Sequence, residues 1–256
     1  MKWLLNILPT IVVFILLIAA AEAYIRWRHI PQYLLPTPSA VAQAVVDNRA
    51  ELASALWQTT RAALLGFGAS AIFGIGIAIV LASSRVVGRA FYPYTIFFQT
   101  VPVVAIAPML VFWFDPGLKS VAVCAFMVSA FPVITNTLAG LMSTEPALTD
   151  LFRLYRSGPM ARLIKLRLPW ALPNILTGLR ISAGLAVIGA VVGEFAAADL
   201  NQQGLGPKIQ AWAKNGDTAE VFAAIVIASL LGLLMLSIIN LLGYPLLRHW
   251  HASAKQ

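Results

Sequence analysis

The chain has 256 residues, of which 60% are apolar and 11% charged, and its formal net charge is +8. So little polar surface excludes an ordinary water-soluble globule and indicates an integral membrane protein. The basic residues flank apolar stretches instead of forming one patch, which favours orientation in an anionic-lipid membrane over nucleic-acid binding.

The first apolar run covers residues 4–24 and is long enough to cross about 30 Å of hydrocarbon as a helix. A secretory signal peptide is the alternative, because residues 21–23 (Ala-Glu-Ala) are similar to a small-residue cleavage site. The run is longer than the apolar core of a usual signal peptide, and only Lys2 supplies a charged start. We therefore expect an uncleaved spanning helix.

A proline-containing linker follows, and residues 39–56 then have apolar side chains at helical spacing. These residues are too polar to span, so they predict an interfacial helix. Residues 1–58 are accordingly predicted to form an N-terminal unit of one membrane helix, a periplasmic linker and this interfacial helix.

The second predicted span, residues 59–82, opens a membrane core that we place at residues 59–247. Small residues recur at every fourth position of this span, at Ala62, Gly66, Ser70, Gly74 and Ala78. Such a stripe lets another helix approach closely and favours a packing seam over a substrate path. A short basic loop with Arg85 and Arg89 is expected next.

The third predicted span, residues 92–114, contains Pro93, Pro102 and Pro108. Proline inside a helix removes a backbone hydrogen bond, and in a membrane the freed carbonyl groups need a protein partner or a water-lined cavity. A broken helix beside a translocation path, with Pro102 and Pro108 on it, is one interpretation. A kinked structural helix is the other.

A short loop leads to the fourth predicted span, residues 118–141. Ser129 and Asn136 are seven residues apart and therefore share a helix face. Polar groups in hydrocarbon either bond to neighbouring helices or line water, so both residues are candidates for helix packing and for a translocation path.

The most charged segment of the chain, residues 150–173, reads DLFRLYRSGPMARLIKLRLPWALP and lies in a loop predicted over residues 142–173. Its charged side chains are Asp150, Arg153, Arg156, Arg162, Lys165 and Arg167. A basic loop between spans is expected to face the cytoplasm. This loop is long enough to form a docking surface.

The fifth predicted span covers residues 174–198. It has a second small-residue stripe at Gly178, Ser182, Ala186, Gly189 and Gly193. Glu194 lies near its far end and is a functional candidate, although a carboxylate at a helix end can also reach the interface. A polar loop (residues 199–220), a last span (221–243) and a cytoplasmic tail (248–256) complete the prediction.

Six spans return the chain to the side on which it started. With both termini and the charged loop in the cytoplasm, 11 of the 18 Lys and Arg residues lie inside and 7 outside. This excess of positive charge inside supports the assignment.

The charged segment resembles the cytoplasmic EAA loop of ABC importer permeases, whose pattern is Glu-Ala-Ala, three residues, Gly, nine residues, Ile, one residue, Leu-Pro. Counted back from the Leu-Pro pair, this pattern corresponds to Asp150, Arg156, Leu166, Leu168 and Pro169. Leu151 and Phe152 replace the alanines, Arg156 replaces the glycine, and Gly158 can supply the bend. The following ILTGLRISAGLAVIGAVVGEF looks like the nitrate, sulfonate, taurine and vitamin-precursor branch of that family.

The resemblance implies an all-α, polytopic membrane protein of about six transmembrane helices, with the MetI-like fold of type I ABC importer permeases. It also implies that the loop forms a short coupling helix in a cleft of the ATPase. The residues implicated are Asp150, Leu151, Phe152, Arg156, Gly158, Leu166, Leu168 and Pro169, with Arg153 and Tyr155 as neighbours. Pro169 and Pro173 would stiffen the link to the fifth span, so that motion of the ATPase reaches the membrane helices.

By the same resemblance, two permease copies, a homodimer, pair with two ATP-binding cassette ATPase subunits, which use the ATP. A periplasmic or lipid-anchored solute-binding protein would deliver a small solute such as a sulfonate, nitrate, taurine, bicarbonate, a pyrimidine or riboflavin. Membrane lipid is the other expected partner, and no nucleic acid is expected. The expected location is the cell inner membrane, with both termini cytoplasmic.

No G-x-x-x-x-G-K-[ST] loop, clustered metal ligands or G-x-S-x-G elbow occurs, and the one cysteine, Cys124, lies in an apolar run. We therefore expect no enzymatic activity, metal or cofactor in this chain. An ion-coupled secondary transporter is an alternative, but it predicts ionisable residues at mid-membrane, and only Glu194 and Glu22 are candidates. A membrane scaffold without a transport role is the third hypothesis.

Overall fold

The structure is a computed structural model that describes residues 2–197 and 203–248. Within these ranges, the side chains of residues 2–7, 85, 89 and 246–248 are not described. The elements are α1 (Lys2–Trp27), α2 (Pro38–Asp47), α3 (Arg49–Ser83), α4 (Arg85–Thr100), α5 (Val103–Phe114), α6 (Leu118–Met142), α7 (Pro146–Leu154), α8 (Pro159–Arg162), the π-helix η1 (Leu163–Arg167), α9 (Leu168–Ala196), α10 (Leu205–Asn215) and α11 (Thr218–Arg248). The predicted all-α fold is confirmed.

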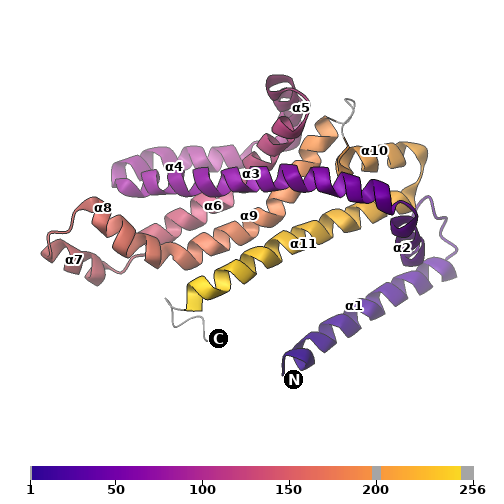
Figure 1. Ribbon diagram of the computed structural model, residues 1–256, viewed down its shortest axis with the longest axis horizontal. Helices are drawn as coiled ribbons and strands as arrows, with labels where there is room; N and C mark the ends of the chain where they lie inside the picture. The colour runs from indigo at the N-terminus through magenta and orange to yellow at the C-terminus, as the bar shows by residue number, and fades with distance from the viewer. Residues whose placement is uncertain (1, 198–202, 249–256) are drawn as a thin grey trace.

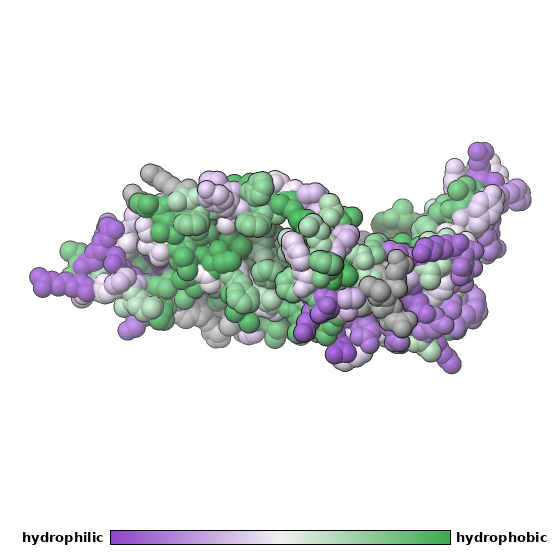
Figure 2. Space-filling view, turned by 90° about the horizontal axis from the view of Figure 1, so that it is seen from above, coloured by the Kyte–Doolittle hydropathy of each residue, from purple (hydrophilic) through white to green (hydrophobic). Residues whose placement is uncertain are grey.

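Five segments are long and apolar enough to cross a membrane: Leu8–Trp27, Arg49–Ser83, Leu118–Met142, Pro159–Ala196 and Thr218–Pro245. A sixth span results if α4 and α5, which meet at a bend of 93°, cross together. The layout of about six transmembrane helices is therefore confirmed. In Figure 2, hydrophobic residues cover the middle of the visible face and hydrophilic residues gather toward its two ends, as expected for a membrane belt.

The long helices lie side by side, with α7 and α8 at one end of the bundle and α2 and α10 at the other (Figure 1). Helix α6 lies at the centre and packs against α3 and α9. Helix α1 extends away from the bundle beyond α2 (Figure 1), and of its described side chains only Ile25 is buried.

Both predicted small-residue stripes are helix-packing seams. All five stripe residues of α3 and all five of α9 are buried. A methyl group added at Gly66 would lie 2.7 Å from the Ala122 carbonyl oxygen of α6, and one added at Gly189 would lie 2.8 Å from Ala125 Cα of α6. The absence of side chains at these positions is therefore what lets α3 and α9 contact α6.

Four predicted boundaries are wrong. The interfacial helix ends at Asp47, and residues 49–56 belong to the membrane helix α3, because Asn48 caps α2 and α3 starts directly after it. The predicted basic loop after the second span consists of Ser84 alone, because α4 already starts at Arg85. The Ser84 hydroxyl accepts the N–H of Val86 and caps α4.

The fifth span begins before residue 174: helix α9 starts at Leu168, with Pro169 in its first turn, and the apolar helical segment extends back to Pro159. The predicted polar loop at 199–220 contains the helix α10. Residues 198–202, with Asp199, and the tail 249–256 lie outside the described residues.

Candidate functional site

The predicted coupling residues Asp150, Leu151, Phe152 and Arg153 lie on α7, a nine-residue helix without a buried residue. Two leucines of α7, Leu151 and Leu154, are exposed to solvent, and Leu154 is 82% exposed. Tyr155 directly follows the helix and is 77% exposed. Asp150 and Arg153 form an exposed ion pair at 3.1 Å, which contributes little to stability. An amphipathic helix that shows apolar residues to solvent is suited to bind a groove on another protein.

Helix α7 ends in a Schellman motif centred on Arg156. The N–H of Arg156 donates to the Arg153 carbonyl at 2.8 Å, and the N–H of Ser157 donates to the Phe152 carbonyl at 3.0 Å. Arg156 takes φ +50°, the left-handed conformation that glycine normally occupies at this place. The bend therefore lies at Arg156, and the expectation that Gly158 supplies it is wrong, since Gly158 has φ −64°.

The second half of the motif anchors the segment to the bundle. Leu166 is buried, and Leu168 packs at the edge of a core cluster formed by α6 and α9. The Trp170 indole donates to the Ser143 carbonyl at 3.1 Å and so fixes the start of α9 to the end of α6. The link from α8 through η1 to α9 is continuous helix, with Pro169 in the first turn of α9. The motif thus has two parts on different elements. One is the exposed helix α7, and the other is residues 159–170, which are packed against the bundle and are called the root of α7.

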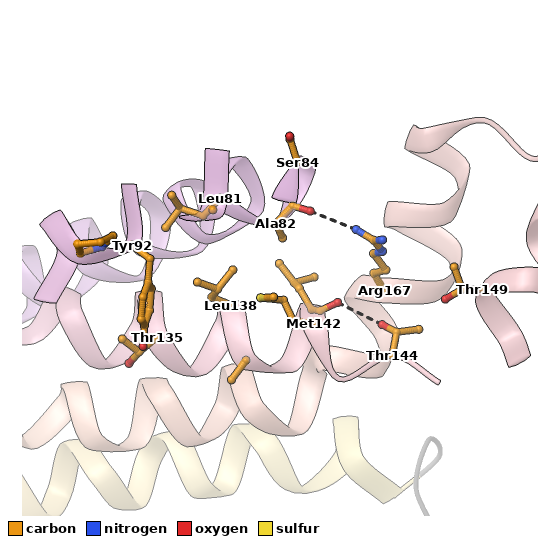
Figure 3. A pocket seen from close by; sticks show the side chains of 14 residues that line it. Leu81, Ala82, Ser84, Tyr92, Thr135, Leu138, Met142, Thr144, Thr149 and Arg167 are labelled. Atoms are coloured by element: carbon orange, nitrogen blue, oxygen red, sulfur yellow. Dashed lines mark hydrogen bonds between the residues drawn. The ribbon is translucent and has the colours of Figure 1, made fainter. Parts of the chain in front are cut away.

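A cavity of about 660 Å³ lies beside this root, between the ends of α3, α4, α6, α7 and η1 (Figure 3). Arg167 lies at one end of the cavity and Tyr92 toward the other, with Leu81, Leu138 and Met142 between them (Figure 3). The lining hydroxyl groups come from Ser84, Tyr92, Thr135, Thr144 and Thr149. The cavity has the size and the largely apolar lining typical of a site for a small organic molecule.

Arg167 is the cationic group in the described lining of this cavity, and no Asp or Glu is part of that lining. One guanidinium nitrogen of Arg167 donates to the Ala82 carbonyl at the end of α3, at 3.2 Å (Figure 3). This hydrogen bond connects η1 with α3. The guanidinium has five donors in total, so one bond leaves most of them unused.

The predicted proline helix is broken. Val101 and Pro102 are extended between α4 and α5, as expected for a proline and the residue before it, and Pro102 caps α5. Pro108 lies inside α5 on its exposed side, while Ala107 and Leu110 pack against Cys124 of α6. A role of Pro102 and Pro108 beside a translocation path stays a prediction.

Ser129 bonds to neighbouring helices, whereas the side-chain amide of Asn136 bonds within its own helix. Ser129 is fully buried, lies 2.5 Å from the Ser70 hydroxyl of α3 and accepts from the Ser182 hydroxyl of α9 through its carbonyl at 2.6 Å. The amide of Asn136 donates to the Pro132 carbonyl on its own helix, beside Gly178. The contacts of Ser129 fit helix packing, and a role of Ser129 and Asn136 in a translocation path stays a prediction.

Glu194 is 2% exposed and contacts the start of helix α10. Its carboxylate accepts from the Thr59 hydroxyl at 2.7 Å and from the Gly206 N–H at 2.8 Å, and Thr59 in turn accepts from the Leu205 N–H at 3.0 Å. A methyl group at Gly204 would overlap the carboxylate. Glu194 and Thr59 therefore accept two free N–H groups at the start of α10, and the Glu194 carboxylate is buried in protein.

Glu22, the other carboxylate within a predicted span, has a similar role. It accepts from the Ser39 N–H at the start of α2, at 3.0 Å, and pairs with Arg26. Both intramembrane carboxylates thus cap neighbouring helices, which weakens the case for an ion-coupled transporter.

Sequence reasoning missed Thr59 and Arg167 as site residues. In the sequence, Arg167 stands out only as a loop charge and Thr59 only as the start of a span. No local signal marks either residue, because their partners, Glu194 and Ala82, lie 135 and 85 residues away in the chain.

Comparison with known proteins agrees with this geometry. Residues 70–249 match the model of the binding-protein-dependent transport system inner membrane component family. The chain is 38% identical over 205 residues to the formylaminopyrimidine transport permease protein ThiX of Halalkalibacterium halodurans, covering 79% of this chain and 80% of the relative. It is 32% identical over 246 residues to the riboflavin transport system permease protein RibX of Chloroflexus aurantiacus, covering 94% and 90%.

The fold is similar to a crystal structure of an amino acid ABC transporter with histidines, with a TM-score of 0.58 and 14% identity over 80% of this chain and 97% of that one. The spans, the packing seams and the exposed helix at one end define a multi-pass membrane transport protein. The chain belongs to the binding-protein-dependent transport system inner membrane component family and is a permease subunit of an ABC importer for small solutes. This family is non-enzymatic, and membership implies an ATPase and a solute-binding protein as partners.

Proposed function

We propose that this permease couples to its ATPase through residues 150–169, with α7 as the docking helix. The observation that carries the proposal is that α7 is an amphipathic helix with no buried residue, held at the end of the bundle opposite α2 and α10 (Figure 1). Leu151, Leu154 and Tyr155 would enter a groove of the ATPase as apolar anchors, and Arg153 and Arg156 would set the register. Phe152 is only half-buried and contributes less exposed surface.

Motion of α7 would reach the membrane through its root. The segment from Pro159 to Arg167 continues as helix into α9, and Trp170 and Arg167 tie it to the ends of α6 and α3. A continuous helix with hydrogen-bonded ends transmits displacement better than a loose loop. The end of the bundle that carries α7 is accordingly the cytoplasmic end, with both termini on that side.

Two copies of the chain would form the translocation path. Helix α4 shows Phe91, Phe97 and Phe98 on its surface, and α5 shows Phe112 and Trp113, all more than half exposed. These aromatic faces flank the proline break and support pairing with a second copy there, while lipid covers the remaining apolar surface. The partner subunits hydrolyse the ATP, and a solute-binding protein delivers the solute.

The transported solute is proposed to belong to the set named for the relatives. By their names, relatives at 38%, 32% and 31% identity transport formylaminopyrimidine, riboflavin and aliphatic sulfonates. Uptake of labelled members of this set into cells with and without the permease distinguishes among them.

The test of coupling is co-purification of the ATPase from native membranes. Leu154→Asp places a charge on the exposed face of α7, while Leu34→Asp makes the same change at an exposed leucine, 68% accessible, in the linker before α2. We expect wild type and Leu34→Asp to retain the ATPase and Leu154→Asp, still inserted, to lose it. Retention by Leu154→Asp would contradict docking through α7.

A further inference from the structure

We propose that the cavity beside the root of α7 is a binding site for a small organic anion at the cytoplasmic exit of the permease. The inference rests on the proposed function, since it places the site at the end of the bundle where solute would leave. The ligand class is a molecule with an anionic head, such as a sulfonate or carboxylate, on an apolar or aromatic body.

The positive charge in the cavity lining favours a ligand with a negative charge. Arg167 contributes a positive charge, and no carboxylate lies in the described lining to neutralise it. None of the three ion pairs in the described part of the chain includes Arg167. A guanidinium with unused donors in a largely apolar cavity binds sulfonate, phosphate or carboxylate through charge-assisted hydrogen bonds.

Ser84 is the hydroxyl residue that follows the end of α3 near Arg167. Ser84 lines the cavity, and its hydroxyl oxygen accepts the Val86 N–H, which leaves the hydroxyl hydrogen to donate. In Figure 3, Arg167 lies at one end of the cavity, and Ser84 lies beyond Ala82 with its hydroxyl oxygen directed away from the other lining side chains. Arg167 therefore places the anionic head at this end.

The remainder of the cavity is apolar and has room for the body of the ligand. Leu81, Leu138 and Met142 line its middle, and the ring of Tyr92 lies toward the far end (Figure 3). A fully hydrated inorganic anion would leave this surface without contacts, whereas an organic body would bury it. The volume of about 660 Å³ holds a molecule larger than the head group alone.

The cavity lies next to the segment that we propose to couple the permease to its ATPase. Thr149 of α7 and Arg167 of η1 both line it, and Arg167 also holds the end of α3 through the Ala82 carbonyl. An anion bound to the unused donors of Arg167 contacts the same guanidinium that holds the Ala82 carbonyl. Occupancy is thus expected to alter the link between α3 and the root of α7.

The test measures charge selection inside the cavity with thiol reagents of opposite charge. A Thr144→Cys variant, with the buried Cys124 as the native thiol background, is prepared as the permease–ATPase complex in nanodiscs. The probes are 2-sulfonatoethyl methanethiosulfonate (anionic) and 2-(trimethylammonium)ethyl methanethiosulfonate (cationic). Val46→Cys, exposed on α2 at the other end of the bundle, is the matched control site.

We expect the ratio of anionic to cationic labelling rates at Thr144→Cys to exceed that at Val46→Cys by at least about fivefold, because a unit charge a few ångströms away acts on each reagent. Arg167→Gln should remove this preference and Arg167→Lys should keep it, which separates charge from misfolding. Naphthalene-1-sulfonate should slow labelling at Thr144→Cys and not at Val46→Cys. Equal ratios at both sites, or a ratio unaffected by Arg167→Gln, would overturn the proposal.

Two further arms identify the source of the anion and separate the proposals. If replacing phosphatidylcholine by phosphatidylglycerol slows labelling at Thr144→Cys as naphthalene-1-sulfonate does, the anionic head belongs to a lipid, and the exit site for solute is refuted. Loss of charge preference in a complex that retains its ATPase refutes only the anion site. Failure of wild type to retain an ATPase refutes the coupling proposal, while labelling of the permease alone still reports on the cavity.

Discussion

Replacing Gly178 of α9 by alanine should separate α9 from α6. The added methyl group would lie 2.8 Å from the Pro132 carbonyl oxygen, 3.0 Å from Asn136 Cβ and 3.2 Å from Val133 Cα. These are backbone atoms or the first atom of a side chain, so no change of rotamer relieves the contacts. Overpacking of this kind typically costs about 1–3 kcal/mol.

Gly184, six residues along the same helix, is the matched control because no atom lies within 4 Å of its added methyl group. Alanine is favoured over glycine inside a helix by about 1 kcal/mol, and this gain is common to both variants. The difference between Gly178→Ala and Gly184→Ala therefore isolates the packing term, and we expect about 1–3 kcal/mol.

The assay is the free energy of unfolding of the purified permease, measured by titration with sodium dodecyl sulfate in mixed micelles. Gly184→Ala should be as stable as wild type or more stable, and Gly178→Ala should be less stable than Gly184→Ala. Gly189→Ala, whose methyl group would lie 2.8 Å from Ala125 Cα, should behave like Gly178→Ala. Equal stability of Gly178→Ala and Gly184→Ala would refute the close approach of α9 and α6.

Arg156→Gly should stabilise the end of α7 by about 1 kcal/mol relative to Arg156→Ala, because both remove the charge but only glycine adopts φ +50° without strain. Hydrogen exchange at the Ser157 amide should be slower in the glycine variant, and equal exchange would argue against the Schellman motif. Thr59→Val should destabilise the start of α10 by about 1–3 kcal/mol, since the Leu205 N–H loses its acceptor. Thr60→Val is its control, because among the described residues the Thr60 hydroxyl bonds to Leu56 of its own helix. Faster exchange at the Leu205 amide in both variants, or in neither, would contradict the proposed role of Thr59.

Local patterns in the sequence were sufficient to locate most of the membrane spans and both of their seams, although not every boundary. Apolar runs of at least twenty residues identify spans because the hydrocarbon thickness is fixed. The stripes through Gly66 and Gly178 identify seams because side chains four residues apart share a helix face. The charged segment at 150–173 was predicted as a coupling loop, and its Leu-Pro pair marks the start of α9.

Backbone conformation corrected part of that prediction. The motif glycine is replaced by Arg156, and the sequence suggested that Gly158 takes over the bend. The structure places the left-handed residue at Arg156, in the position that the motif assigns to glycine. The hydrogen bonds at the end of α7 fix this position, and glycine content alone does not.

Contacts between distant segments were decided only by the tertiary structure. Glu194 could be seen as a buried carboxylate, but its partners Thr59 and Gly206 follow from how α3, α9 and α10 meet. The cavity around Arg167 likewise needs the ends of five elements at one place, and no sequence spacing encodes that meeting. Periodicity fixes which face of a helix is apolar or small, whereas the partner of each polar side chain depends on the packing of whole helices.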